Sequence, residues 1–324
     1  MKKLFTKIAF AVAGFTGIVS AQQDPQFTQF MYNKLIYNAG YAGTSGAICG
    51  VAQFRQQWVS FDGAPQSIAL AGDMRLSGLP LGVGVNIMTD KIGPMSTFFL
   101  RAAGSYNITK LAGGTLGLGL DFGIQQKSIS SEWTTPEPLK NDPRIPGIIA
   151  LQDNGNFSKL SYDIGAGAFY QIPGKFYAGL STTHLPAQEI KTDKTGFKVK
   201  RHYYLMTGYT FNVNKWSDLT PNIMFKTDAA GSAVDLNLTY LWSKMIWVGG
   251  TYRPTDAGSV AILAGVQGQA GLGNSISWKV GYSYDITASK LKTYAKGSHE
   301  IILGVCFAPK IKKTTTYGDP RFLD

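Results

Sequence analysis

ISWKVGYSYDI, residues 276–286, decides the fold, because its side chains alternate between two kinds. Large apolar side chains occupy every second position, and Ser, Lys, Gly, Ser and Asp fill the positions between them. Successive side chains of a β-strand point to opposite faces, so this stretch predicts a strand with one apolar and one polar or small face. Its length also suffices to cross a bilayer, which takes about 9–11 tilted residues.

The same alternation recurs along the chain, for example in LGVGVNI (81–87), LGLGLDFGI (116–124) and VDLNLTYLW (234–242). These segments are longer than the strands of soluble sandwiches, which usually have about 5–6 residues. No run of 18 apolar residues follows the first 21 positions, so the sequence offers no spanning helix there. The predicted strands number fourteen, at 47–57, 66–75, 80–89, 96–109, 113–126, 160–171, 175–183, 200–212, 219–228, 233–242, 245–253, 258–269, 275–286 and 298–307.

The connections between these strands fall into two groups. If both termini lie in the periplasm, as we expect for an even strand number, the periplasmic connections are short: 77–79, 110–112, 172–174, 213–218, 243–244 and 270–274. The opposite side receives the long loops, at 127–159, 184–199 and 287–297. This asymmetry is typical of outer-membrane barrels. The sequence therefore predicts an all-β, antiparallel, fourteen-stranded transmembrane β-barrel of the outer membrane.

Composition agrees with an exported membrane barrel. Charged residues make up 16% of the chain, below a soluble average of about 25%, while glycines number 38 and aromatics reach 12%. The formal net charge is +11, but the lysines are scattered and the chain carries an export signal. We therefore expect no nucleic-acid partner.

The first 21 residues read as a secretory signal. Three lysines form its positive start, residues 8–19 form a short apolar run, and Val19-Ser20-Ala21 gives the small-x-small pattern of a cleavage site. We expect cleavage after Ala21, an N-terminal periplasmic or plug segment at 22–46, a barrel at 47–308 and a periplasmic tail at 309–324.

The two cysteines test the closure of the barrel. Cys49 lies near the start of the first predicted strand and Cys306 near the end of the last. If these strands pair, alternation turns both cysteines inward at the periplasmic rim, and we expect them to be neighbours. The sequence leaves open whether they form a disulfide.

No catalytic, metal-binding or cofactor-binding pattern emerges, so we expect neither an enzyme nor a cofactor. His184, His202 and His299 lie at loop or strand edges without the spacing of a zinc site, and we interpret them as polar loop residues. The glycines within 113–123 do not match G-x-G-x-x-G. They are better explained as barrel glycines that relieve crowding on the lumen face.

Charged residues within the predicted strands fall largely on the polar faces. Arg or Lys on the lipid face would cost about 2–4 kcal/mol near the midplane. We therefore predict lumen residues that pair across the barrel, although they could instead line a path for ions or solutes. They are Arg55, Asp73, Arg75, Arg101, Asp121, Lys226, Asp228, Asp235, Lys279 and Asp285.

The segment QQDPQFTQFMYNKLIYNAGYAG (22–43) fits neither a helical nor a strand period. Its aromatic residues need apolar cover, either from the barrel lumen or from a partner at the periplasmic rim. DPQF at 24–27 is echoed by DPRF at 319–322, which is either coincidence or a pair of docking motifs for a periplasmic partner. The predicted plug or partner contacts are Asp24, Pro25, Gln26, Phe27, Phe30, Tyr32, Tyr37, Tyr41, Asp319, Pro320, Arg321 and Phe322.

This segment and several later stretches resemble the PorP/SprF family of outer-membrane proteins associated with type IX secretion. The resemblance covers nearly the whole mature chain. It departs from the family at Lys34 and Ala39, where members often carry prolines, and this loosens a rigid extended segment. The stretches are 22–46, RQQWVSFDGAPQSIALAGD (55–73), LGVGVNIMTDKIGPMS (81–96), KFYAGLSTTHLP (175–186), RHYYLMTGYTF (201–211), TYRPTDAGSVAILAGVQ (251–267), KVGYSYDITASKL (279–291) and GSHEIILGV (297–305).

The resemblance implies a barrel that supports secretion or surface anchoring of cargo proteins, such as gliding-motility adhesins, through protein–protein contacts. The partners it implies are outer-membrane lipid, type IX secretion components, secreted surface adhesins, and periplasmic ring or motor proteins. One alternative is an outer-membrane porin or solute-uptake channel. Another is a soluble, secreted β-sandwich adhesin, against which strand length and the sorting of loop lengths argue.

Overall fold

The computed structural model describes residues 24–130, 157–191, 196–228, 231–254, 259–271, 275–286 and 295–308. These residues form strands and two short 3-10 helices, η1 (Phe30–Tyr32) and η2 (Ala39–Tyr41). Within them, no helix is long and apolar enough to span a membrane. The strands are β1 (Ile48–Gln56), β2 (Gln66–Arg75), β3 (Leu81–Ile92), β4 (Met95–Leu111), β5 (Gly114–Ile129), β6 (Phe157–Ile172), β7 (Phe176–Thr183), β8 (Glu189–Lys191), β9 (Gly196–Lys198), β10 (His202–Tyr209), β11 (Phe211–Asn214), β12 (Ser217–Thr227), β13 (Ser232–Trp242), β14 (Ile246–Arg253), β15 (Ser259–Ala270), β16 (Ile276–Ile286) and β17 (Ser298–Phe307).

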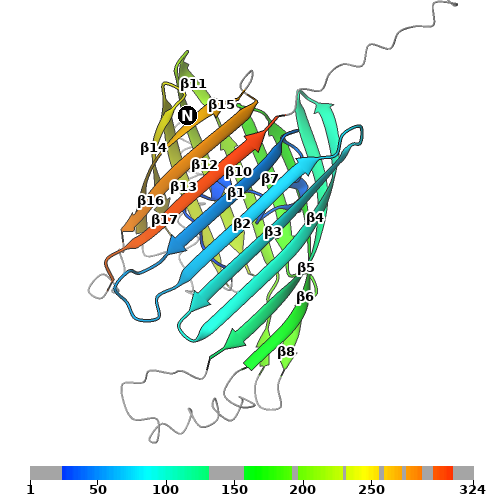
Figure 1. Ribbon diagram of the computed structural model, residues 1–324, viewed down its shortest axis with the longest axis vertical. Coiled ribbons are helices and arrows are strands. Elements are labelled where there is room, and N and C mark those ends of the chain that lie inside the picture. The colour runs from blue at the N-terminus through cyan, green and yellow to red at the C-terminus, as the bar shows by residue number, and fades with distance from the viewer. Residues whose placement is uncertain are drawn as a thin grey trace, which may run out of the picture.

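Fourteen strands form a closed antiparallel ring, which confirms the predicted barrel (Figure 1). The ring consists of β1 to β7, β10, and β12 to β17, and it closes where β17 pairs with β1. β11 continues the line of β10 and also pairs with β12, while β8 and β9 form a separate two-stranded sheet. Closure leaves no free edge among the ring strands, which a bilayer requires because it offers no water to unpaired backbone groups.

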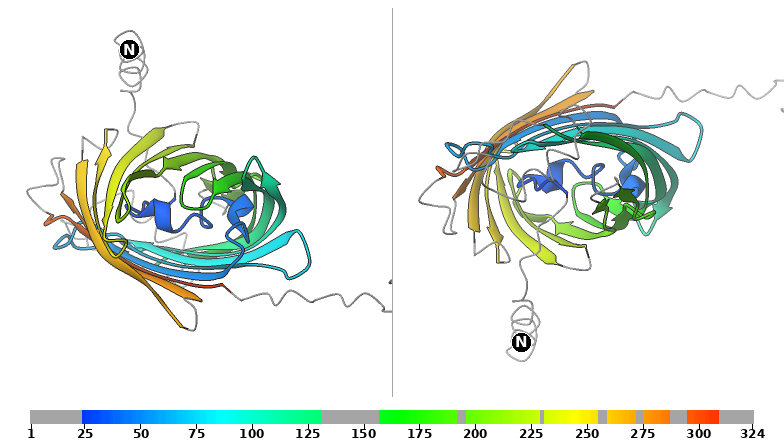
Figure 2. Two further views of the ribbon diagram at one scale, coloured as in Figure 1. Left: turned by 90° about the horizontal axis from the view of Figure 1, so that it is seen from above. Right: turned by 90° about the horizontal axis from the view of Figure 1, so that it is seen from below.

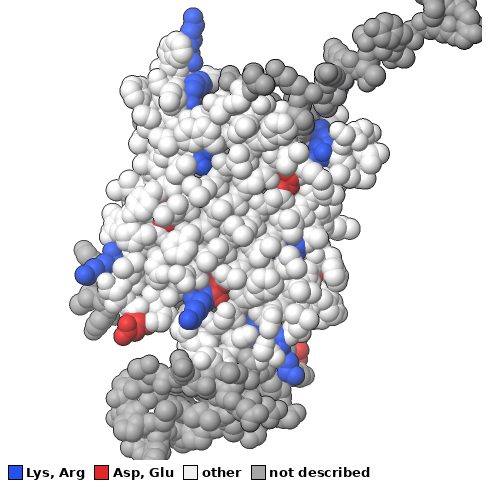
Figure 3. All heavy atoms as spheres, viewed as in Figure 1, with Lys and Arg blue, Asp and Glu red and all other residues white. Residues whose placement is uncertain are grey.

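The two faces of the barrel wall differ as the alternation predicts. On β5, Leu118, Leu120 and Phe122 point outward and are exposed by 47%, 67% and 60%, whereas Asp121 between them is buried in the barrel. The face seen in Figure 3 is predominantly uncharged between its two ends. The exterior can therefore contact lipid, while the charges collect inside.

The barrel has two rims with different connections. We call the side carrying the connections at 76–80, 112–113, 173–175, 215–216, 243–245 and 271–275 the short-turn rim. The opposite side, the long-loop rim, carries those at 57–65, 93–94, 130–156, 184–201, 228–231, 254–258 and 287–297. At the turn between β13 and β14, Ser243 and Lys244 have φ of 52° and 57°, and the amide of Met245 donates to the carbonyl of Trp242, so these two residues are the central positions of a turn of type I′.

The lumen contains the chain's own N-terminal segment. Residues 24–47, which we call the plug, lie inside the ring in both end-on views (Figure 2). Their apolar side chains join those of the inner wall in two buried clusters. The hydrophobic core of this barrel therefore consists of the side chains that pack between the plug and the wall.

Candidate functional site

The plug runs from the long-loop side of the lumen to the short-turn rim. Asp24 lies beside His184 and His202, at the long-loop ends of β7 and β10, and Ala47 directly precedes β1. We expected the segment to lead into the barrel from the periplasmic side. The described N-terminal end, Asp24, lies at the long-loop end of the lumen, where it pairs with the two histidines.

The aromatic residues of the plug pack against the inner wall. Phe27, Phe30 and Tyr37 are buried, and Tyr32 and Tyr41 are half-buried against the same cluster. Tyr37 contacts Tyr204 of β10, Tyr41 contacts Phe169 of β6, and Tyr32 contacts Trp247 of β14, with ring centroids 5.4, 5.1 and 5.0 Å apart. The lumen thus provides the apolar cover that these side chains need.

One buried carboxylate holds the backbone of the plug. The amide of Thr28 donates to one oxygen of Glu300 at 2.7 Å, and the amide of Gln29 donates to the other at 2.8 Å. The side chain of Gln53 on β1 also donates to Glu300, at 2.8 Å. Hydrogen bonds to an ionised acceptor are roughly twice as strong as neutral ones, so Glu300 fixes the plug firmly to β17.

The Thr28 hydroxyl lies in an array of paired charges. It accepts from Arg55 at 2.9 Å and from Arg253 at 2.6 Å, and it lies 2.9 Å from the carboxylate oxygens of Asp285. Arg55 pairs with Asp285 at 2.6 Å and with Glu300 at 3.1 Å, and Arg253 pairs with Asp285 at 2.8 Å. We call these five residues the Thr28 clamp. Its positive and negative charges balance, which buried ions require.

A second group of polar contacts holds the start of the plug. The Asp24 carboxylate lies 3.0 Å from His184 Nε2 and accepts a hydrogen bond from the Tyr204 hydroxyl at 2.5 Å. His184 Nδ1 lies 3.1 Å from Asp163, which pairs with Arg101 at 2.8 Å. Burial alone would lower the pKa of His184, but the carboxylates of Asp24 and Asp163 raise it to about 9. His184 is therefore charged at neutral pH and links the plug to β6.

The atoms of Asp24, His184 and His202 also lie close enough for metal ligands, within 4.8 Å of one another. However, both ring nitrogens of His184 already contact carboxylates, and the Arg101 guanidinium lies 3.4 Å from its Nε2. A metal ion would meet this positive charge, so we interpret the group as ion pairs that hold the plug. Our prediction of ordinary polar loop residues was wrong for His184 and His202, which are 2% and 1% exposed.

The middle of the plug lies directly against glycines of the wall. A side chain added at Gly117 of β5 would collide with the carbonyl of Gly40, and one added at Gly119 would collide with Ala39. The side chain of Asn38 donates to carbonyls of β6 and β7 at 3.0 and 3.2 Å. Gly117 and Gly119 thus admit the plug backbone, whereas Gly114 and Gly123 lie against other wall residues, as expected of glycines that relieve crowding.

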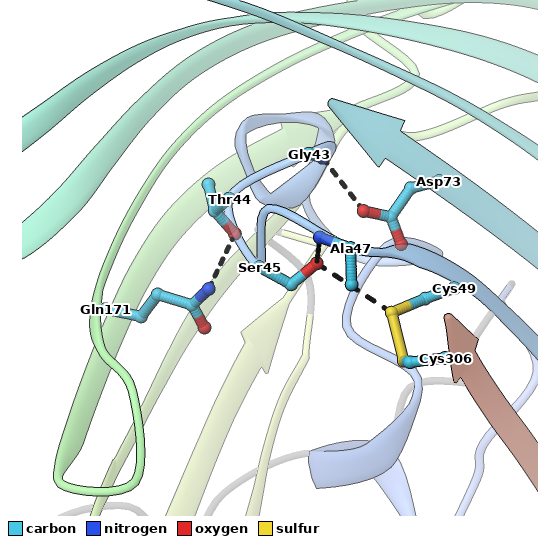
Figure 4. Close-up of a disulfide and its surroundings, with 8 residues drawn as sticks. All are labelled: Gly43, Thr44, Ser45, Ala47, Cys49, Asp73, Gln171 and Cys306. Atoms are coloured by element: carbon cyan, nitrogen blue, oxygen red, sulfur yellow. Dashed lines mark hydrogen bonds between the residues drawn. A yellow bond between two sulfur atoms is a disulfide. The ribbon is translucent and has the colours of Figure 1, made fainter. Parts of the chain in front are cut away.

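At the short-turn rim, the last plug residues bind the wall again (Figure 4). The amide of Gly43 donates to Asp73 of β2 at 2.8 Å, and Gln171 of β6 donates to the hydroxyl of Thr44 at 3.1 Å. These two contacts lie on strands that are not neighbours in the ring. They therefore hold the end of the plug across the lumen before the chain turns into β1.

The cysteines meet at this rim. Cys49 and Cys306 are directly opposite in the β1–β17 register, their Cα atoms lie 4.0 Å apart, and a disulfide joins them (Figure 4). The Ser45 hydroxyl lies 3.8 Å from the Cys49 sulfur. The disulfide thus covalently fastens the seam at which the ring closes, next to the end of the plug.

Sequence reasoning singled out several of these residues and missed others. Pro25 and Gln26 are half-buried in the lumen beside the predicted aromatics. Asp319, Pro320, Arg321 and Phe322 lie outside the described residues. Thr28, Arg253 and Glu300 were not predicted. Glu300 lies an even number of positions from Cys306 on the same strand, so the alternation of side chains could have assigned it to the inner face of β17.

An apolar exterior, a closed antiparallel ring and a charged lumen filled by an internal segment define an outer-membrane β-barrel. A solved barrel with a similar fold is a "CymD monoaromatic hydrocarbon channel", with a TM-score of 0.50 and 11% identity over 91% of this chain and 95% of that one. The toluene transporter TodX of Pseudomonas putida has a TM-score of 0.47 and 9% identity over 85% of this chain and 93% of that one. No curated protein matched the sequence.

The sequence shows to which family of outer-membrane barrels the chain belongs. The family model described as "Type IX secretion system membrane protein PorP/SprF" matches residues 19–305. The chain belongs to this family, and it is a membrane component of the type IX secretion system.

Proposed function

We propose that this barrel supports secretion or surface anchoring of cargo proteins, such as gliding-motility adhesins, through protein–protein contacts rather than by passing solutes. The observation that carries the proposal is the plug. Its polar contacts at Asp24, Thr28, Gly43 and Thr44 join it to strands around the ring, so the lumen is occupied along its length. A barrel filled in this way offers its rims to partners, which fits a component of a secretion machine.

In this proposal the signal peptide is removed after Ala21, and the short-turn rim faces the periplasm. The last described strand, β17, ends at that rim, so the tail at 309–324 begins there. Asp319, Pro320, Arg321 and Phe322 are then available to periplasmic ring or motor proteins. The DPQF copy at 24–27 has a different role, since it contacts the lumen.

A solute channel is the second candidate, because the CymD barrel, which has a similar fold, is a monoaromatic hydrocarbon channel. That likeness shows the fold alone. A channel would require the plug to move, and the buried ion pairs of the Thr28 clamp oppose such a movement.

Affinity isolation of the full chain from outer membranes tests the proposal. We expect type IX secretion components or a secreted surface protein among the co-purifying proteins, and we expect recovery to fall when residues 309–324 are deleted. In cells, deletion of the gene should remove a surface adhesin and leave solute uptake intact. Recovery of no secretion component, together with lost uptake of a solute and normal surface adhesins, would contradict the proposal and favour the channel.

A further inference from the structure

A cavity of about 930 Å³ lies between the plug and the short-turn half of the wall. Plug residues 31–35 and Tyr41 line one side, and residues of β1, β2, β6, β7 and β12 to β17 line the other. Rim residues 173–175 and 244–245 also line it, so the cavity reaches the short-turn rim. We call this space the vestibule. Its volume lies in the range of sites for small organic ligands, about 300–1,000 Å³.

Two lysines enter the vestibule from opposite sides. Lys34 belongs to the plug, and Lys279 belongs to β16. The ammonium of Lys34 lies 4.2 Å from the ring centre of Tyr177, and that of Lys279 lies 3.6 Å from the ring centre of Tyr32. Trp247 packs against Tyr32 and also lines the vestibule. The result is a cavity with cations set among aromatic rings.

In the described part of the chain, neither lysine lies within ion-pair distance of a carboxylate. Of the acidic residues that line the vestibule, Asp218 pairs with Lys244 at 2.5 Å, and Asp73 accepts a hydrogen bond from the amide of Gly43. The arginines of the Thr28 clamp, by contrast, are all paired with carboxylates. The lining of the vestibule holds four lysines, Lys34, Lys175, Lys244 and Lys279, and two carboxylates, Asp73 and Asp218, so positive charge is in excess there.

Such an arrangement is unfavourable unless an anion enters. Ring faces attract an ammonium group, but they carry no net charge and do not relieve the repulsion between two cations that share a cavity. A carboxylate between the two ammonium groups would supply the missing charge, and the rings would cover an apolar body.

We propose that the vestibule binds a small organic carboxylate with an aromatic or aliphatic body. The carboxylate lies between Lys34 and Lys279, and the body packs against Tyr32 and Tyr177. The proposal does not depend on the secretion role.

Calorimetric titration of the purified, plugged barrel with phenylacetate tests the proposal. We expect saturable binding of phenylacetate with a stoichiometry of one, and affinities at least tenfold weaker for the uncharged phenylacetamide and for inorganic phosphate. Phenylacetamide keeps the apolar body but lacks the negative charge, whereas phosphate keeps negative charge but lacks the apolar body. This comparison uses the unaltered protein, so it is decisive even if a variant does not fold.

Matched variants locate the site. Lys34→Gln and Lys279→Gln should each weaken phenylacetate binding at least tenfold, while Lys279→Arg, which keeps the charge, should weaken it less. Lys91→Gln makes the same charge change at an exposed position on the opposite side and should leave binding unchanged. Absence of phenylacetate binding, equal binding of phenylacetamide, or folded Lys34→Gln and Lys279→Gln variants with unaltered affinity would overturn the proposal.

Discussion

The two halves of the plug are held by different physical means. Residues 24–29 are held by ionised groups, at Asp24 and at the Thr28 clamp. Residues 38–47 are held by backbone packed on glycines and by hydrogen bonds at a rim that a disulfide fastens. The first half should therefore respond to changes in charge and pH, and the second half to changes in volume and covalent closure.

Removal of Glu300 should have the largest effect. Glu300→Ala leaves Arg55 without one of its carboxylates and leaves the amides of Thr28 and Gln29 without acceptors. Breaking a buried pair in this way costs about 3–5 kcal/mol. Urea unfolding in detergent measures the loss, with Asp62→Ala in an exposed loop as the control. Equal stability of the two variants would show that the clamp does not hold this half.

Loss of the disulfide should have the next largest effect. The bond joins residues separated by 257 positions, so Cys306→Ser frees a very long loop in the unfolded chain and should cost about 2–4 kcal/mol. The same unfolding measurement applies. Cys49→Ser removes the same bond and should give the same loss, and a large difference between the two variants would contradict a shared disulfide.

A bulky side chain on the glycine surface should have a smaller effect. Gly119→Val places methyl groups where Ala39 lies, and such overpacking costs about 1–3 kcal/mol. Hydrogen exchange should show faster exchange at residues 38–44 than at 24–29. Gly104→Val is the matched control, since a side chain there meets open space. Equally protected plugs in both variants would contradict close packing at this surface.

Alkaline pH should loosen only the charged half. The pKa of His184 is raised to about 9 from an ordinary 6.5, so the charged imidazole stabilises the fold below pH 6.5, and this contribution is lost as the pH rises through about 9. Amide exchange, corrected for its intrinsic pH dependence, should lose protection near Asp24 between pH 8 and 10. His184→Gln should remove this change, and unchanged protection of the wild-type segment would refute the ion pair.

Much of the fold could be predicted because the relevant information is local. Alternation in stretches such as 116–124 and 276–286 marks each strand and its inward face. Closure of the barrel then predicts that Cys49 and Cys306 are neighbours. The direction of the plug could not be predicted. It depends on the contact between Asp24 and His184, which is 160 positions away, and the sequence around neither residue indicates which residue it contacts.

The site shows the same division. The sequence alone predicts that Phe27, Phe30 and Tyr37 must be covered by apolar surface. It leaves open whether the lumen or a partner provides that surface. Thr28 was overlooked because a single threonine between Phe27 and Gln29 has no local pattern that indicates buried ion pairs around it. Its role appears only when Arg55, Arg253 and Asp285 are brought together by three different strands.

The central claim is that the plug closes the barrel, and the conductance of single barrels in a planar bilayer tests it most directly. We predict that the purified full chain inserts without a steady ionic current at neutral pH, because the plug is fixed from Asp24 to Thr44. Insertion is checked independently by heat-modifiable migration of the recovered protein. A stable, ohmic current through the unaltered chain, with residues 24–44 still protected from exchange, would contradict the claim.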